Sequence, residues 1–490
     1  MQRQPTGIWA TWRQVGIAPA QATTLLLGLI LGALLLARVG GLAERVIATT
    51  AYPFQFDPTE GIILSEVRML AQGENIYAPF TAERFISAPY PPLYYVLLLP
   101  PLKFAAPSFT WGRIVALLAA LSIAGILWAI AAQTAGRRWA LIAAGLWLGS
   151  TPLLVWANRL KPDLLAVAFS LLGLLVLMRW PRRLGLVALC FALAWYSKQS
   201  ALAAPAAATL WLMLQDWRRA LRLVLLTAAA IGVPFLILDL LTGHGFYIHL
   251  IGFHALPWSA RRWLGLLGDM AGYHAILALL SLVWLGLALR RGRRALPLPA
   301  VYLPLAALGS FSGGTFGGFH NHMLEFLAAL CLGATLLLGA ARLSRAPALL
   351  AALAALVLQV ALSWSTPDWL AWELSNVPTA QGRARMEALA RFVADQPGEV
   401  WSDNIGLLTT VGKPVRFNDP LIMAQSAMLG WWDERVFVEE IRSGGFSAIL
   451  WRGDVHSGPR PNDLSPAAYE AIRERYEITF RDVKLVYTPR

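Results

Sequence analysis

Charged side chains are scarce in this chain. Only 14% of its 490 residues are charged, 57% are hydrophobic and the mean hydropathy is +0.55, whereas about 25% of the residues in a soluble domain are charged. This composition excludes a soluble globular domain and indicates an integral membrane protein.

Cysteine is nearly absent. The two cysteines, Cys190 and Cys331, each lie inside an apolar run, which excludes a disulfide framework and a metal site built on cysteine. The histidines also lack a spacing typical of a zinc site. A divalent metal is therefore not implied, and no other cofactor is predicted.

Apolar runs recur along the first three-quarters of the chain. A hydrocarbon core of about 30 Å needs about 17 to 25 residues of helix to cross it. Each run is continuously apolar rather than alternating, which favours helices over strands. The sequence thus predicts an all-α polytopic membrane protein with about 11 to 13 transmembrane helices within residues 1–365. The runs lie near residues 22–43, 113–134, 139–156, 161–178, 183–196, 199–215, 219–241, 272–290, 296–311, 322–341 and 346–364.

Basic residues gather in the short connections between these runs. The chain has 41 Lys and Arg against 28 Asp and Glu, a net charge of +13, and arginines cluster near residues 137–138, 179–183, 218–222 and 290–294. Short basic loops remain in the cytoplasm, so the charge reports topology and predicts no binding of nucleic acid. We expect a multi-pass protein of the plasma (inner) membrane with a cytoplasmic N-terminus.

The longest outer loop in this topology covers residues 44–112. Within it, residues 90–105 (YPPLYYVLLLPPLKFA) are apolar but short, and prolines flank them. They are predicted to form a re-entrant or interfacial helix on the outer face. If they instead crossed the membrane, every later loop would change sides and the arginine clusters would lie outside.

The composition changes in residues 376–490. The strand-like segments EVWSD, KPVRF, FSAILWRG and YEITFRDVKLVYT alternate with helical patterns near residues 380–394, 433–443 and 465–475. This order predicts a small α/β extracytoplasmic domain. Because it has neither a glycine-rich phosphate loop nor a nucleophile elbow, we expect it to support the outer loop or to dock a partner.

Acidic residues are few, yet three of them, Asp57, Glu60 and Glu66, gather in the outer stretch FQFDPTEGIILSE. Asp57, Pro58 and Glu60 have the pattern of a helix start, with Asp57 as the N-cap and Glu60 closing a capping box. A helix over about residues 58–72 would explain both acids structurally. The alternative is that Asp57 and Glu60 carry chemistry at the membrane surface.

Further polar residues are expected at the same outer face. Ionisable residues at membrane depth are costly and by default mark function. Asp163 could instead complement a helix dipole, Lys198 could snorkel to the headgroups, and a histidine at a helix end is commonly an interface residue. The candidate residues for binding a substrate are Lys161, Asp163, Tyr90, Tyr94, His249, His254, His320, His322 and Glu325, and the cationic residues Lys198, Arg261 and Arg262 are expected at the same face.

Acids and cations together at an outer membrane surface suit one kind of chemistry. A lipid-linked donor with an anionic phosphate needs Lys or Arg to hold the phosphate and stabilise it as a leaving group. An acceptor hydroxyl or amine needs a carboxylate as general base. Transfer of a sugar from a polyprenyl phosphate by a single displacement needs one base and inverts the anomeric centre.

The chain resembles the GT-C superfamily of membrane glycosyltransferases. The resemblance lies in FDPTEGIILSEVRMLAQGENIY, SAPYPPLYYVLLLPPL, KPDLLAVAFSLLGLL, YSKQSALAAPAAA and NHMLEFLAAL, in this order within about residues 20–365. The branch it is most similar to contains bacterial relatives of protein O-mannosyltransferases, including the lipid A aminoarabinose transferase and the rhizobial galacturonosyl transferases.

This resemblance implies roles for some of the candidates. Asp57 would be the base, and Glu60 its partner or a clamp for the acceptor, although the two acids are adjacent in many relatives and separated by two residues here. Asp163 would be the second acid and Lys198 the lysine near the donor phosphate. Arg261 or Arg262 would also lie near that phosphate.

The implied partners are a polyprenyl-phosphate-linked sugar, membrane lipid and an acceptor that is a lipid, a glycan or a protein. A transporter or flippase of a lipid-linked saccharide is the alternative from another class. The sequence does not favour a transporter, because no internal repeat with paired broken helices is evident.

Overall fold

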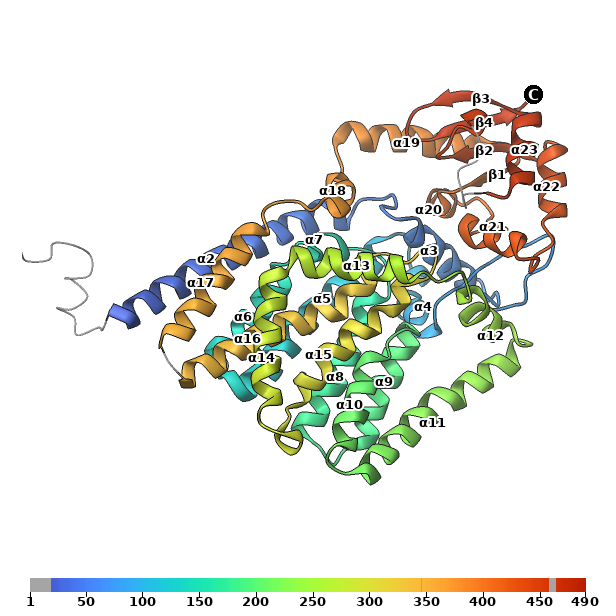
Figure 1. The fold of residues 1–490 in the computed structure, drawn as a ribbon. Helices are drawn as coiled ribbons and strands as arrows, with labels where there is room; N and C mark the ends of the chain where they lie inside the picture. Colours follow the sequence, from blue (N-terminus) through green and yellow to red (C-terminus); the bar gives the residue numbers. More distant parts are fainter. Residues whose placement is uncertain (1–18, 345, 458–463) are drawn as a thin grey trace, which may run out of the picture.

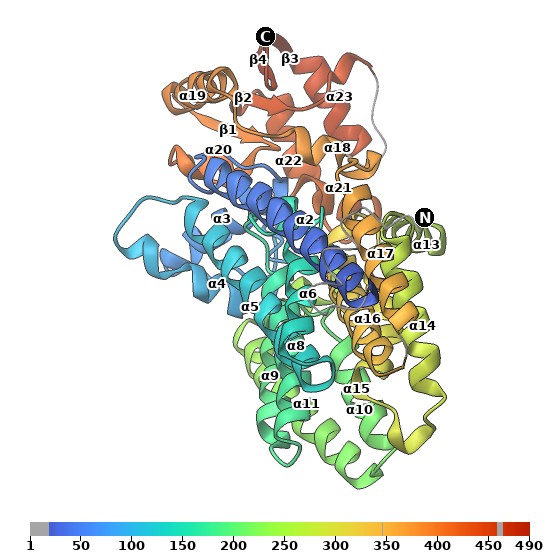
Figure 2. The ribbon, with the colours of Figure 1, turned by 90° about the vertical axis from the view of Figure 1, so that its left-hand side faces the viewer.

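The computed structural model describes residues 19–344, 346–457 and 464–490. A bundle of apolar helices carries a smaller layer at one end, and the C-terminal sheet lies beyond this layer (Figures 1 and 2). The first 18 residues of the predicted membrane module lie outside the described residues.

The apolar runs predicted as spans form helices of the bundle, except that the run 139–156 is broken into α6 and the four-residue α7, and α13 was not predicted. The fold class predicted from the sequence is therefore confirmed. The bundle helices are α2 (Pro19–Thr50), α5 (Thr110–Ala135), α6 (Arg137–Leu148), α7 (Leu153–Trp156), α8 (Asp163–Arg179), α9 (Leu184–Ser197), α10 (Ala203–Met213), α11 (Trp217–Leu241), α13 (Ala260–Tyr273), α14 (Ala275–Leu289), α15 (Leu298–Gly309), α16 (Leu324–Ser344) and α17 (Ala346–Leu362).

The bundle helices differ in length. Among the described residues, α2, α5, α11 and the segment His320–Ala341 are long and apolar enough to cross a membrane, and α13 with α14 forms a further candidate that is bent by 93°. The shorter helices complete the bundle, and α16 packs against α5, α6, α14, α15 and α17. The number of crossings stays a prediction.

The layer above the bundle is built from short helices. The segment predicted as a re-entrant or interfacial helix forms the seven-residue α4 and one 3-10 turn, and a helix of that length rises only about 10 Å. The elements of this layer are α3 (Pro58–Ala71), α4 (Pro92–Leu98), η1 (Pro100–Lys103), α12 (Gly245–Leu250), η2 (Gly252–His254), η4 (Ser310–Gly314) and η5 (His320–Met323).

The C-terminal part forms a four-stranded sheet with the order β1-β2-β4-β3. Strands β1 and β2 pair in parallel, whereas β4 pairs antiparallel with β2 and β3. The strands are β1 (Glu399–Ser402), β2 (Phe446–Trp451), β3 (Tyr476–Arg481) and β4 (Leu485–Pro489), and the helices are α18 (Asp368–Ser375), α19 (Ala380–Asp395), α20 (Ile405–Thr410), α21 (Pro420–Met428), α22 (Arg435–Arg442), η6 (Val455–Ser457) and α23 (Pro466–Arg475).

One strand prediction in this part is wrong. The segment KPVRF joins no sheet, and its only pairing among the described residues is a single bridge between Phe417 and Phe85. The backbone N–H of Phe85 donates to the Arg416 carbonyl at 2.8 Å, and that of Asn418 donates to the Phe85 carbonyl at 3.1 Å. The β-forming residues of KPVRF thus tie the C-terminal part to the outer loop rather than extend the sheet.

Helix α3 is held against the C-terminal part by a close backbone approach. Gly61 on α3 faces Gly406 on α20, and a Cβ atom at Gly61 would lie 2.3 Å from the Gly406 nitrogen. Arg68 lies two helical turns after Gly61 on α3. Its guanidinium donates to the carbonyls of Thr409, Gly412 and Lys413 at 3.2 Å each. These carbonyls belong to the last turn of α20 and to the turn that follows it, so Arg68 positions α3 and α20 together.

Glu66 joins three segments of the outer layer. Its carboxylate is fully buried and accepts hydrogen bonds from the Ala88 N–H at 3.0 Å, the Tyr95 hydroxyl at 2.7 Å and the Asn418 amide at 2.8 Å. Burial raises the pKa of Glu66 to about 8, and the negative charge of the nearby Asp419 acts in the same direction.

We expect Glu66→Gln to weaken the pH dependence of stability. The pKa of Glu66 is raised in the folded state, so between about pH 4.5 and about pH 8 the folded protein holds a proton that the unfolded chain has released. The contribution of Glu66 to stability therefore falls as the pH rises through this range. Glutamine mimics the protonated form and removes this fall. Melting temperatures of the detergent-solubilised protein between pH 5 and pH 8 test this, with the exposed Glu74→Gln as control; an unchanged slope would contradict it.

Candidate active site

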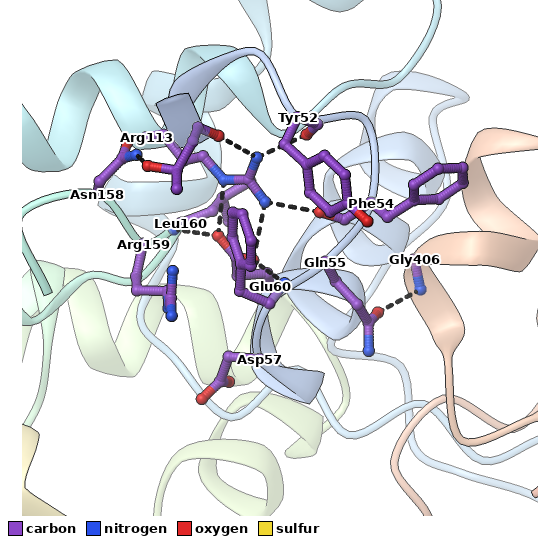
Figure 3. Close-up of polar contacts among 12 residues, drawn as sticks. Tyr52, Phe54, Gln55, Asp57, Glu60, Arg113, Asn158, Arg159, Leu160 and Gly406 are labelled. Atoms are coloured by element: carbon purple, nitrogen blue, oxygen red, sulfur yellow. Dashed lines mark hydrogen bonds and ion pairs between the residues drawn. The ribbon is translucent and has the colours of Figure 1, made fainter. Parts of the chain in front are cut away.

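The first outer loop is organised by a buried ion pair between Arg113 and Glu60 (Figure 3). Both side chains are fully buried, with Arg113 Nε and Nη2 each 3.0 Å from a Glu60 carboxylate oxygen. The guanidinium also donates to the carbonyls of Thr49, Tyr52 and Phe54 at 2.6 to 3.0 Å. Arg113 thereby binds the chain that leaves α2 to the first turn of α3.

Glu60 has no capacity left for a substrate. Its two oxygens also accept from the backbone N–H groups of Phe56 at 2.7 Å and Leu160 at 2.9 Å. The capping box expected with Asp57 is not formed. The Glu60 carboxylate pairs with Arg113 and accepts from the backbone N–H of Phe56, whereas a capping box needs it to accept from the N–H of Asp57. The role of Glu60 seen here is to hold the loop in place.

Asp57 caps α3, as predicted, and points away from the Arg113 pair (Figure 3). One carboxylate oxygen accepts from the Thr59 N–H at 2.8 Å, and the other lies 2.9 Å from Lys161 Nζ. The Asp57 side chain retains 20% exposure. Burial alone would raise the pKa of Asp57, but the Lys161 ammonium and the hydrogen bond from Thr59 outweigh it and lower the pKa.

A second ion pair lies next to the first. Lys198, at the end of α9, places its Nζ 2.5 Å from Asp163 Oδ1 at the start of α8, and the Asn321 amide donates to the same oxygen at 2.7 Å. Lys161 lies between the two acids in sequence, and its pKa is raised because Asp57 and Asp163 together outweigh the effect of burial. Two acids and two lysines from three segments therefore form one cluster of alternating charge.

Lys198 lies at the boundary of two hollows. A small one of about 30 Å³ is lined by Asp163, Lys198, His322 and Glu325, and a cleft of about 530 Å³ is lined by Lys198, Tyr90, His254 and Asp419. Because the two share Lys198, Ser200, Ser312 and His322, the lysine is accessible from the larger cleft.

The cleft combines a polar end with a long apolar wall. Gln199, Ser312 and Thr315 contribute further polar groups. Its apolar wall comes from α3, the outer loop, the segment from the end of α12 through η2, the loop before η5 and the start of α21. The apolar lining consists of Ile62, Pro89, Leu250, Ile251, Phe253, Ala255, Leu256, Phe316, Leu421 and Ile422. An anionic group at Lys198 could thus carry an apolar chain along the wall.

Asp419 is the carboxylate that lines this cleft. It is the N-cap of α21 and accepts from the Ile422 N–H at 3.2 Å and from the Ser87 hydroxyl at 3.2 Å. Burial raises its pKa to about 6, with hydrogen bonds from Ile422 and Ser87 acting in the opposite direction. A carboxylate with such a pKa is close to the range suited to a general base at neutral pH.

Some of the predicted residues do not reach the cleft. His249 is buried, with its ring nitrogens 2.5 Å from the Ser87 carbonyl and 2.9 Å from the Ala78 carbonyl, so it anchors the outer loop. His320 faces the other way, pairs with Asp269 at 3.0 Å and stacks on Trp369.

The remaining candidates lie at different distances from the cleft. Tyr94 is fully buried within the outer layer, and Arg261 is exposed on α13. Arg262 is nearer, since it donates to the carbonyl of the cleft residue Thr315 at 3.1 Å. His254 faces Gln199 in the cleft.

Two residues of this site were missed by sequence reasoning. Asp419 precedes a proline and starts a helix, as Asp57 does, so the repeated Asp-Pro pattern was a usable signal. Arg113 is a single arginine at the start of an apolar run, but nothing local identifies Glu60 as its partner. Among the described residues, no group of three or more His, Cys, Asp or Glu is arranged to hold a metal ion.

Solved structures resemble this chain over nearly its whole length. ArnT from Cupriavidus metallidurans in the apo state matches with a TM-score of 0.62 and 14% identity, covering 95% of this chain and 98% of ArnT. The same protein bound to undecaprenyl phosphate gives 0.59 at the same identity and coverage. The Archaeoglobus fulgidus oligosaccharyltransferase in the apo form gives 0.55 at 13% identity, covering 87% of this chain and 70% of that chain.

These neighbours establish the fold. No family model matches the sequence, and no curated protein matches it closely. ArnT and the oligosaccharyltransferase are GT-C glycosyltransferases, so the chain has the GT-C fold and this prediction from the sequence is confirmed.

We expect Arg113→Met to destabilise the protein strongly, because it leaves the Glu60 carboxylate buried without its cation. The expected loss is about 3 to 5 kcal/mol, enough to abolish the cooperative melting transition of the solubilised protein or to lower it by many degrees. The control is Arg84→Met, which removes the exposed Arg84–Glu74 pair and should cost less than about 1 kcal/mol. Equal effects of the two substitutions would contradict the structural role of the buried pair.

Proposed function

We propose that this chain is an inverting glycosyltransferase that moves a sugar from a polyprenyl-phosphate-linked donor to an acceptor at the outer face of the membrane. The observation that carries the proposal is Lys198, paired with Asp163 at the floor of a cleft with a long apolar wall. The GT-C fold, shared with a protein solved with undecaprenyl phosphate, supports a lipid phosphate as the ligand.

In this proposal, Lys198 binds the donor phosphate. Its ammonium would neutralise the negative charge that grows on the phosphate oxygen as the glycosidic bond breaks, and such preorganised charge is worth about 10² to 10³ in rate. Asp163 and Asn321 would hold the lysine in position, and the apolar wall would cover the first isoprene units. Arg262 lies behind the cleft residues Thr315 and Phe316 and could add a second positive charge.

The transfer step needs one base. The acceptor oxygen or nitrogen gives its proton to a carboxylate and forms a bond to the anomeric carbon, while the bond from that carbon to the phosphate oxygen breaks and its electron pair leaves with the phosphate. Inversion follows from a single displacement. No second carboxylate is required as a nucleophile.

Two carboxylates are candidates for the base. Asp57 is the one that the family resemblance implies, and it lies in the charge cluster next to the cleft residue Thr59. Its pairing with Lys161 makes it a weak base. Asp419 faces the cleft directly and has a pKa of about 6, but it comes from the C-terminal part. A base at Asp419 would require activity to rise with pH through about 6, whereas a base at Asp57 would not.

The orientation is also part of the proposal. The arginine clusters and the cleft lie at opposite ends of the bundle helices: Lys198 follows the end of α9, whereas Arg179, Arg182 and Arg183 lie in the connection before it. Basic connections in the cytoplasm would place the cleft and the C-terminal part outside a plasma membrane.

We expect Lys198→Met to lower kcat/KM for the donor by about 10²-fold or more, since the leaving phosphate loses its cation. The measurement is transfer by purified protein, using radiolabelled polyprenyl-phosphate sugars and a membrane extract as the acceptor source. Lys198→Arg keeps the charge and should retain part of the activity. A folded Lys198→Met protein with wild-type donor kinetics would refute the phosphate role, and the absence of transfer from any donor by the wild type would favour a transporter.

The comparison of Asp57→Asn with Asp419→Asn should identify the base. Asparagine is as good an N-cap as aspartate, so both variants should fold. The variant that loses the base is expected to lose about 10² to 10⁴ in kcat. If that variant is Asp419→Asn, the acidic limb near pH 6 in the wild-type profile of kcat/KM should disappear with it. A wild-type profile without this limb would exclude Asp419 as the base.

A further inference from the structure

A further hollow, separate from the cleft, lies beside α2. It has a volume of about 370 Å³ and shares no lining residue with the cleft. Helices α2 and α17 run side by side there (Figure 2). We call this hollow the α2 groove. Its lining residues are Ala37, Arg38, Gly41, Glu44, Arg45 and Ala48 on α2, together with Leu154, Trp364 and Val377.

The spacing of the α2 residues explains the groove. Positions 37, 41, 44 and 48 recur every three or four residues and therefore lie on one face of the helix. The small residues Ala37, Gly41 and Ala48 leave space on this face, and a Cβ atom at Gly41 would have no other atom within 4 Å. Beside this face, Leu36 and Ile47 on α2 are 74% and 81% exposed, as expected for residues that contact lipid.

Two guanidinium groups line this groove together with Glu44, and the other lining residues are apolar. Arg38 donates through Nε to the Gly149 carbonyl at 2.9 Å and through Nη2 to the Thr151 hydroxyl at 2.7 Å. Its guanidinium carbon lies 5.2 Å from the centre of the Trp364 ring. Arg45 donates to the backbone carbonyls of Glu373 at 2.8 Å and Leu374 at 3.0 Å.

Neither arginine is neutralised by these contacts. Carbonyl, hydroxyl and ring partners orient a guanidinium but carry no formal charge, and Arg38 Nη1 has no hydrogen bond to the described residues. Among the described residues, Glu44 is the only acid that lines the α2 groove. Glu373 also acts on Arg45, but its carboxylate forms an ion pair with Arg159. With two arginines and one glutamate, the lining has one uncompensated positive charge.

The position of this charge is unusual for a membrane helix. Arg38 lies about 18 Å from the C-terminal end of α2 at 1.5 Å per residue, and Arg45 about 10 Å nearer to that end. An arginine within a span is costly, and by default it marks a site of function. A monoanionic phosphodiester supplies the missing negative charge and bonds well to guanidinium groups, and its acyl chains would lie against Leu36 and Leu154.

We propose that the α2 groove binds the phosphate of an anionic membrane phospholipid. The phosphate lies between Arg38 and Arg45, and the chains extend along the exposed side of α2. This site is separate from the cleft and is independent of the proposed glycosyl transfer.

The test is to fill the groove with a side chain. Gly41→Leu places an isobutyl group in open space, where it displaces a lipid without a clash and raises the helix propensity. Gly40→Leu is the matched control, because it also adds leucine in open space on α2 but at a position that does not line the groove. Each purified protein is incubated with phosphatidylglycerol or phosphatidylcholine, and the retained lipids are counted by native mass spectrometry.

We expect the wild type and Gly40→Leu to retain one more phosphatidylglycerol molecule than Gly41→Leu. With phosphatidylcholine, we expect all three proteins to retain the same number of lipids. Arg45→Gln keeps hydrogen-bonding capacity but loses the charge, and should weaken phosphatidylglycerol retention about tenfold. Equal retention by Gly41→Leu and Gly40→Leu would overturn the proposal. It would also be overturned if Gly41→Leu changed the oligomeric state instead, because the groove would then hold a second copy of the chain.

Discussion

The outer half of this molecule depends on the buried contact between Arg113 and Glu60. Arginine and glutamate are both removed from water, so each is stable there only with its full set of partners. Three backbone carbonyls, two backbone N–H groups and two aromatic rings complete these sets. As a result, the end of α2, the start of α3 and the residue Leu160 before α8 keep one relative position. Asp57 and Lys161 lie close in sequence to Glu60 and Leu160, so this contact also fixes their positions.

The carboxylates near this contact have different roles, because each has different neighbours. The charge of Glu60 is neutralised by Arg113, and Glu60 stabilises the fold. Asp57 is held ionised by Lys161, whereas Glu66 and Asp419 have no cationic partner among the described residues, and burial raises their pKa values. The C-terminal part supplies Asp419 and the Asn418 amide that contacts Glu66. That part therefore completes the cleft wall as well as supporting the outer loop.

Local patterns predicted much of this architecture. Continuous hydrophobicity predicted the bundle helices, and strand-forming residues predicted the strands formed by EVWSD, FSAILWRG and YEITFRDVKLVYT, because both signals depend on neighbours within one element. The helix start at Asp57 was predictable for the same reason. KPVRF failed as a strand because its backbone pairs with Phe85 of the outer loop, a partner more than three hundred residues away that its own sequence does not reveal.

The sequence by itself determined the membrane class, the helices, the C-terminal strands and the group of residues from which the site is drawn, since composition and spacing carry that information. Only the tertiary structure decided which of those residues meet. It paired Glu60 with Arg113, brought Lys198 to Asp163, turned His249 and His320 away, and added Asp419 to the cleft. The physical reason is that ionic and hydrogen-bonding partners are selected by distance in space, which the order of residues along the chain does not show.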